Sequence, residues 1–152
     1  MYCPLCNSDN TKVNDSRSAA DGVSVRRRRE CVKCGYRFST IEEVEILDLA
    51  VIKRDGRKEP YSKMKLVHGL ERSLEKRDYD KEAFNCLVNQ IERDIQKLKS
   101  SEVSTEEIGK IVMHHLRDFD QVAYIRFASV YRAFQDVQSF EKEVSNLNVS
   151  SA

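Results

Sequence analysis

Hydrophobic residues change their spacing near residue 46, and this change divides the chain into two parts. Residues 1–40 show no helical period. After Pro60 the hydrophobic residues recur three and four positions apart, which is typical of amphipathic helices. The pattern therefore predicts a small β-rich module followed by a larger, mainly helical one.

Four helices are predicted after Pro60, and each begins at a residue whose side chain can cap a helix N-terminus. These residues are Ser62, Asp80, Ser104 and Asp120. Ser104 and Glu107 also have the spacing of a capping box. The side chains expected in the core are, helix by helix, Leu66, Leu70 and Leu74; Phe84, Leu87, Val88, Ile91, Ile95 and Leu98; Ile108, Ile111, Val112 and Leu116; and Val122, Ile125, Phe127, Val130, Tyr131 and Phe134.

The segment before these helices is predicted to be a β-hairpin. The stretches "LDLAVIKRD" and "GRKEPY" flank Asp55-Gly56, a dipeptide suited to a tight turn. An acidic linker is expected near Thr40–Leu47, and the polar end "SNLNVSSA" is expected to fray. We therefore expect an α+β protein with domains at 1–45 and 46–140 and a flexible tail at 141–152.

Composition sharpens the contrast between the two parts. The chain has 152 residues, of which 40% are hydrophobic and 34% charged, as in a globular protein. Residues 1–40 hold eight basic and four acidic side chains, giving +4, and the rest of the chain carries −3. No apolar run approaches the roughly 20 residues that span a bilayer, and the N-terminus lacks the pattern of a signal peptide. We expect a cytoplasmic protein without membrane contact.

Four of the five cysteines form two pairs, Cys3-x-x-Cys6 and Cys31-x-x-Cys34, with 24 residues between the pairs. Two such turns supply the four thiolates of a closed structural zinc site. Disulfides or a redox pair are the alternatives; the reducing compartment argues against the first, and the lack of a βαβ frame against the second. Cys86, within a helical pattern, is expected to be a half-buried thiol without a special role.

An arginine run, "VRRRREC", leads into the second cysteine pair and is expected to form a strand of a two-stranded zinc ribbon. Strand alternation places Arg27 and Arg29 on one face and Arg26 and Arg28 on the other. Guanidinium groups match phosphate and guanine edges, so the run predicts nucleic-acid binding. A solvated basic face, a nuclear-import signal and a lipid-contact patch are the alternatives. The candidate residues are Arg17, Arg26, Arg27, Arg28, Arg29, Lys33 and Arg37.

Cations also converge on the predicted hairpin. Lys53 and Arg54 end its first strand, and Lys63 and Lys65 open the next helix, an arrangement that favours phosphate binding. No Walker A loop occurs in the sequence. The alternative is an ordinary charged surface of a hairpin and a helix.

The zinc ribbon with "RRRREC..CGYRFST", followed by "VIKRDGRKEPYSKMKL", closely resembles the NrdR family of bacterial repressors of ribonucleotide reductase genes. The second block resembles the family's ATP-cone, a hairpin with four to five helices. The resemblance implies one structural Zn²⁺ per chain, ATP and dATP as effectors with Mg²⁺, and double-stranded DNA with paired operator boxes as partner. It also implies nucleotide-dependent oligomers.

The resemblance assigns residues to the nucleotide. Lys53, Arg54 and Lys65 would hold phosphates, and the segment from Glu59 to Lys65 would line the base and ribose. Further candidates lie on other elements. The full set is Val51, Lys53, Arg54, Glu59, Ser62, Lys63, Lys65, Thr105 and Tyr131.

Three functions remain open at this stage: a nucleotide-gated repressor, a nucleic-acid module whose second half only binds protein, and a phosphate-processing enzyme. We do not expect an enzyme, because the sequence has no Walker A loop, no nucleophile–base pair and no Asp-x-Asp cluster. His68, His114 and His115 are expected to be ordinary histidines and not a second metal site. We expect a repressor in the bacterial cytoplasm, associated with the nucleoid when it represses.

Overall fold

The structure is a computed structural model that describes residues 1–19, 22–46, 48–132 and 134–149, the side chains of 148 and 149 excepted. Backbone contacts divide the chain into two units, Met1–Glu45 and Ile46–Ala152. The structure has five helices and two small sheets among the described residues, which confirms the α+β class.

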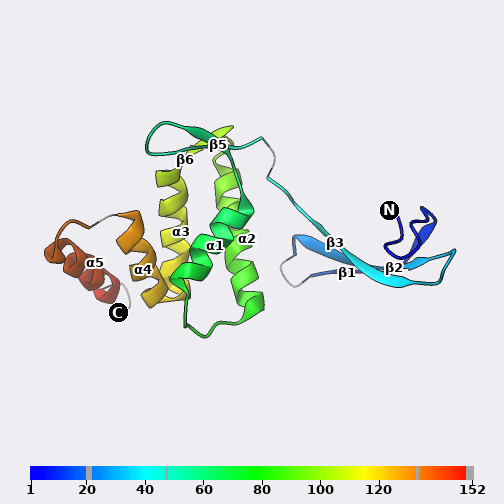
Figure 1. Ribbon diagram of the computed structural model, residues 1–152. Helices are drawn as coiled ribbons and strands as arrows, with labels where there is room; N and C mark the ends of the chain where they lie inside the picture. Colours follow the sequence, from blue (N-terminus) through cyan, green and yellow to red (C-terminus); the bar gives the residue numbers. More distant parts are fainter. Residues whose placement is uncertain (20–21, 47, 133, 150–152) are drawn as a thin grey trace. The chain divides into compact units, whose positions relative to one another are not determined.

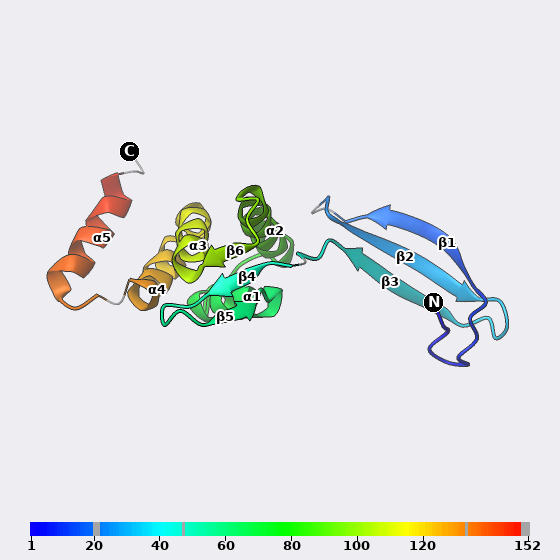
Figure 2. The same cartoon turned by 90° about the horizontal axis from the view of Figure 1, so that it is seen from above.

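The first unit is an antiparallel sheet of three strands in the order β1-β2-β3 (Figures 1 and 2). The strands are β1 (Thr11–Ser18), β2 (Ser24–Cys31) and β3 (Arg37–Glu43). The arginine run forms β2 as predicted, but the prediction of a two-stranded ribbon is wrong. β3 pairs with β2 as far as Glu43, and this pairing includes the first residues of the segment expected to be the linker. The linker therefore begins only after Glu43.

This unit has little hydrophobic core. Among its described residues only Cys3, Ser24 and Cys31 are buried. A sheet with so few buried side chains needs another source of stability, and a metal ion bound by the cysteines would supply it.

The second unit contains a small sheet in the order β5-β4-β6. Its strands are β4 (Ala50–Ile52), β5 (Lys58–Pro60) and β6 (Glu102–Ser104). β4 and β5 form the predicted antiparallel hairpin, and Gly56 adopts a positive φ of 83° in its turn. β6 was not predicted. It pairs in parallel with β4, and a strand of three residues is too short to give a recognisable pattern in the sequence.

Five helices accompany this sheet, which lies across one end of α1, α2 and α3 (Figures 1 and 2). α3 packs against both α2 and α4, α1 packs against α4, and α5 packs against α4. The helices are α1 (Lys63–Ser73), α2 (Lys81–Lys97), α3 (Thr105–Phe119), α4 (Gln121–Tyr131) and α5 (Val137–Val149).

Three of the four predicted caps are confirmed. Asp80 accepts a hydrogen bond from the N–H of Ala83, and Asp120 caps α4 in the same way. Ser104 and Glu107 form the capping box at the start of α3. Ser62 stands at the N-cap of α1 but its side chain makes no capping bond, so that prediction is wrong.

The core of the second unit lies among the helices and beneath β4. Its buried hydrophobic residues are Leu49, Val51, Leu70, Leu74, Phe84, Leu87, Val88, Ile91, Ile95, Val103, Val112, Met113, Leu116, Ala123, Tyr124, Ala128 and Leu147. Leu98, Val122 and Val130, expected in the core, are exposed. α4 instead buries Ala123, Tyr124 and Ala128. It packs against three other helices, and the small side chains of the two alanines allow close contact there.

α5 overlaps the tail expected at 141–152. Over its described residues this segment is helical, with Glu143 and Leu147 buried. Residues 150–152 lie outside the described part of the chain. No helix formed by the described residues is long and apolar enough to cross a membrane.

Candidate functional site

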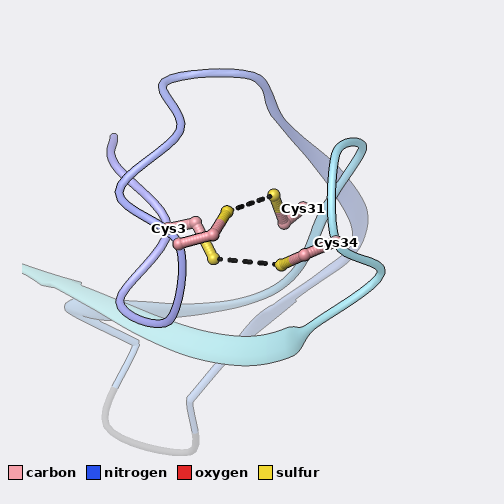
Figure 3. A group of neighbouring side chains, drawn as sticks. Cys3, Cys31 and Cys34 are labelled. Atoms are coloured by element: carbon pink, nitrogen blue, oxygen red, sulfur yellow. Dashed lines mark hydrogen bonds between the residues drawn. The ribbon is translucent and has the colours of Figure 1, made fainter.

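The four cysteines of the first unit lie together. The Sγ atoms of Cys3 and Cys34 are 3.6 Å apart, as are those of Cys6 and Cys31 (Figure 3). All four sulfurs lie within 4.8 Å of one another. Zinc–thiolate bonds of about 2.3 Å place tetrahedral sulfurs about 3.7 Å apart, so this donor set fits a closed Zn²⁺ site.

The two cysteine pairs are held by the same backbone structure. In each pair the residue after the second cysteine donates its N–H to the carbonyl of the first: Asn7 to Cys3 at 2.9 Å, and Gly35 to Cys31 at 2.9 Å. Both donors adopt positive φ angles, 54° for Asn7 and 71° for Gly35. Glycine and asparagine are the residues that adopt this conformation most readily, so the sequence builds two preformed knuckles.

The knuckles also favour the thiolate form of a ligand. Backbone N–H groups of Cys34 and then Lys33 donate to the Cys31 sulfur and lower the pKa of Cys31 to about 7. Since a metal binds the thiolate and not the thiol, these amides favour Cys31 as a ligand. At Cys34 the backbone N–H of Tyr36 acts in the same direction, but burial and the neighbouring thiols raise the pKa to about 12.

The seven candidate nucleic-acid contacts lie on all parts of the first unit. The four arginines of the run occupy β2, and Arg17 lies on β1 opposite Arg26. Arg37 opens β3, and Lys33 is exposed within the second knuckle. The cations therefore extend along the whole sheet and do not form one cluster.

In the second unit, most of the candidate nucleotide residues surround a cavity of about 180 Å³ whose wall is mainly apolar. Seven of the nine predicted residues line it. Its lining is Val51, Lys53, Glu59, Tyr61, Ser62, Lys65, Leu66, Gly69, Thr105, Ile108, Gly109, Val112, Phe127 and Tyr131.

A larger cavity, of about 850 Å³, adjoins the first and is strongly basic. The two cavities share Lys53, Gly69, Thr105, Phe127 and Tyr131. The rest of the larger lining is Arg54, Asp55, Arg57, Arg72, Ser73, Arg126, Ser129 and Val130. An apolar pocket that opens into a cationic basin suits a ligand with one flat apolar end and one anionic end.

Tyr131 lies in the wall that the two cavities share. Its hydroxyl donates to the carbonyl of Glu106 at 2.7 Å, and its ring stacks on Phe127 and lies against the backbone of Gly109. Arg54 donates from Nη2 to the Tyr131 carbonyl, and its guanidinium carbon is 5.9 Å from the ring centre. An anion that engaged Arg54 would therefore act directly on the last turn of α4.

Glu59 stands between two of the predicted phosphate ligands. Its Oε1 is 2.9 Å from Nζ of Lys53 and 2.9 Å from Nζ of Lys65. Hydrogen bonds from Lys53 and then Lys65 lower the pKa of Glu59 below its ordinary value. The carboxylate thus holds both ammonium groups at the edge of the smaller cavity.

Lys63 does not line either cavity. Its Nζ is 3.2 Å from Oε2 of Glu92, a buried residue of α2, and the other oxygen of Glu92 accepts from the hydroxyl of Tyr61 at 3.0 Å. Two neighbours of the cavity-lining Ser62 are therefore fixed to α2 by one carboxylate.

Sequence reasoning missed several residues of the two cavities. Two of these residues could have been found from the sequence. Gly69 in α1 and Gly109 in α3 lower helix stability, so a glycine at these positions suggests close packing or a binding site. Arg72 and Arg126 gave no signal, because only the packing of α1 against α4 brings them to the same cavity.

Comparison with known proteins agrees with this division of the chain. Residues 1–42 match the family model described as the N-terminal domain of NrdR-like transcriptional repressors, and residues 49–137 match the ATP cone domain. The transcriptional repressor NrdR of Limosilactobacillus fermentum is 46% identical over 147 residues, covering 97% of each chain. That of Bradyrhizobium sp. strain ORS 278 is 49% identical over 148 residues, covering 97% of this chain and 92% of the relative. That of Listeria monocytogenes strain EGD-e is 47% identical over 147 residues, covering 97% and 96%.

Proposed function

The chain belongs to the NrdR family of transcriptional repressors, and from this premise we propose that it represses ribonucleotide reductase genes under the control of ATP and dATP. The family's role is regulatory and not catalytic, and its zinc ribbon and ATP cone account for both units of the chain. The regulated genes, the control by two nucleotides and the change of assembly that connects them go beyond the family assignment.

In this proposal the two units divide the work. Residues 1–45 hold one structural Zn²⁺ through Cys3, Cys6, Cys31 and Cys34 and bind DNA, and residues 46–140 bind the nucleotide. The short distances between the four sulfurs support the first assignment. The two adjoining cavities support the second, and they are the observation that carries the proposal.

A nucleoside triphosphate fits the chemistry of these cavities. The base and ribose would occupy the smaller cavity against Val51, Ser62 and Thr105, and the phosphates, with Mg²⁺, would extend into the basic one. Lys53 lies at the junction and Arg54 in the larger cavity, where each would meet phosphate oxygens. The mainly apolar lining of one cavity and the cations of the other support this orientation.

Binding of the phosphates would change contacts that exist without them. Lys53 and Lys65 are held by Glu59, and Arg54 is held by the Tyr131 carbonyl, so a triphosphate competes with both. Release of the Tyr131 carbonyl frees the end of α4, and α4 packs against α1, α3 and α5. The nucleotide can therefore alter the surface that the helices present.

ATP and dATP differ by one 2′-hydroxyl, so the gating requires that this group is bound differently in different assemblies. A nucleotide with equal affinity for every assembly would shift none of them. We propose that ATP and dATP select different oligomers, and that only an oligomer whose zinc ribbons are spaced to match paired operator boxes represses. Spacing of half-sites then gives tight binding to one oligomer only.

Size-exclusion chromatography with light scattering on zinc-loaded protein tests the gating. The protein would be run without nucleotide, with ATP, and with dATP plus ATP. We expect the mass to change with the nucleotide, and each state would then be tested on DNA carrying the boxes upstream of the reductase genes. A mass indifferent to all three conditions would overturn the oligomer switch and leave a zinc-ribbon nucleic-acid binder with an unexplained second unit.

A further inference from the structure

Pairing of β2 with its neighbours sorts the arginine run onto two faces of the sheet. Arg27 lies opposite Ser16 on β1 and Thr40 on β3, and residues that lie opposite each other share a face. Arg26 lies opposite Arg17 and Ile41 on the other face. The run is therefore two pairs of arginines with different surroundings.

The pair Arg27 and Arg29 is bound within the sheet. Arg27 donates from Nε and Nη2 to the two oxygens of Glu42, at 2.9 and 3.0 Å, and this bidentate contact raises its pKa. Arg29 donates from Nε to Oγ1 of Thr40 at 3.1 Å. Both side chains are half-buried. Their donors join β2 to β3, which is a structural role.

The pair Arg26 and Arg28 has no such contacts. Both residues are exposed, and within the described ranges neither side chain forms a hydrogen bond or an ion pair. Arg26 also lies directly opposite Arg17, and like charges in that position repel. Asp15 lies opposite Arg28 on the same face, but its carboxylate accepts from Arg17 at 2.9 Å and, among the described residues, forms no ion pair with Arg28.

A β-bulge creates this arrangement. The pairing of β1 with β2 shifts by one residue between Val13 and Asp15, so that no residue of β2 lies opposite Asn14 in the register. Without the shift Arg17 would lie opposite Val25 and on the face of Arg27. The bulge thus moves Arg17 to the face of Arg26 and Arg28, and its ion-pair partner Asp15 moves to the same face with it.

We infer that the face bearing Arg17, Arg26 and Arg28 is the one that contacts the DNA backbone, and that Arg27 and Arg29 hold the sheet in shape. Alternate residues of a strand are about 6.7 Å apart, and two base-pair steps rise about 6.8 Å, so Arg26 and Arg28 match the DNA repeat. Ser39 and Ile41 lie on the same face, opposite Arg28 and Arg26, where a hydroxyl and an apolar group can meet base edges. The inference rests on the proposed function, since it requires that the first unit binds DNA.

Salt-dependent binding to a labelled duplex of random sequence, several helical turns long, tests the inference without knowledge of the operator. The full-length, zinc-loaded protein is measured in one assembly state, checked by light scattering. The variants are Arg26→Ala, Arg28→Ala, Arg27→Ala and Arg29→Ala, with Arg28→Lys as the variant that keeps the charge. Each lost phosphate contact lowers the salt slope of log K by about one.

We expect Arg26→Ala and Arg28→Ala each to lower the slope by about one and the affinity about tenfold, and Arg28→Lys to restore most of the slope. Arg27→Ala and Arg29→Ala should lower the thermal stability of the sheet and change the affinity less than about threefold while zinc stays bound. Equal losses for both pairs at full zinc content would overturn the inference. Wild-type protein that binds no duplex in any assembly state would instead refute the proposed function.

Discussion

A Cβ atom on Gly109 would lie 2.0 Å from Cε2 of Tyr131, because the tyrosine ring lies directly against the backbone of α3. Gly109 is buried within a helix, where glycine is unfavourable relative to alanine by about 1 kcal/mol. The glycine is thus explained by the ring and not by the backbone conformation. The fit fixes the wall between the two cavities.

Replacing Gly109 with alanine should therefore destabilise the second unit. The ring cannot move freely, since its hydroxyl is bound to the Glu106 carbonyl and its face to Phe127. Overpacking of this kind costs about 1–3 kcal/mol and outweighs the gain in helix propensity. Chemical denaturation without nucleotide measures the loss, and ATP titration measures the damage to the cavity wall.

Gly69→Ala is the matched control, because Gly69 also lies within a helix and lines the same cavities. A Cβ there meets no atom within 4 Å. We expect this variant to gain about 0.5–1 kcal/mol of stability. If Gly109→Ala were also more stable than wild type, the close packing of Tyr131 would not be what requires glycine.

Removal of zinc should unfold the first unit and leave the second folded. Among the described residues of the first unit only Cys3, Ser24 and Cys31 are buried, whereas the second has a continuous hydrophobic core. Hydrogen exchange after chelation should therefore show loss of protection over residues 1–45 and retention in the helices. Persistent protection of β1 and β2 in metal-free protein would contradict this prediction.

The sequence predicted what depends on neighbouring residues. The zinc knuckles, the capping box of Ser104 and the hairpin at Gly56 each lie within a few positions, so spacing alone identifies them. Seven of the nine nucleotide candidates line one cavity. They were found because the family resemblance points to the short segments that carry them.

What the sequence did not predict depends on packing between distant segments. β6 is a strand only because Val103 pairs with β4, which lies far away in the sequence. Arg72 of α1 and Arg126 of α4 line the same cavity only because α1 packs against α4. Hydrophobic periodicity also predicted wrong buried residues for α4, because it favours large side chains over the alanines that close packing selects. Lys63 was predicted to bind phosphate because it lies beside other candidates in the sequence, but its side chain pairs with Glu92 of α2.

Stability at high pH should depend on the contact between α4 and α5. Burial and a hydrogen bond to Glu143 raise the pKa of Tyr124 to about 12, above its unfolded value of about 10. The hydroxyl therefore contributes stability fully below about pH 10, and this contribution is lost as the pH rises through about 12.

Tyr124→Phe removes that titration. The variant should be less stable than wild type by about 1–3 kcal/mol near pH 8, since Glu143 loses one of its two partners, the other being Arg132 at 2.5 Å. The difference should shrink between about pH 10 and 12 in urea denaturation. Other tyrosines titrate equally in both proteins, so a difference that stays constant over this range would show that Tyr124 does not contribute it.

Lys53 and Lys63 should separate nucleotide affinity from stability. Lys53 lines both cavities, whereas Lys63 pairs with the buried Glu92 away from them. Loss of a charge-assisted contact to phosphate costs about 1.5–3 kcal/mol, so Lys53→Ala should weaken ATP binding about tenfold to a hundredfold in calorimetric titration. Lys63→Ala should change affinity less than about twofold yet lower the unfolding free energy by about 1 kcal/mol, because one oxygen of Glu92 loses its ion pair. Equal loss of ATP affinity in both variants would mean that the strand-end cation has no special part in binding the phosphates.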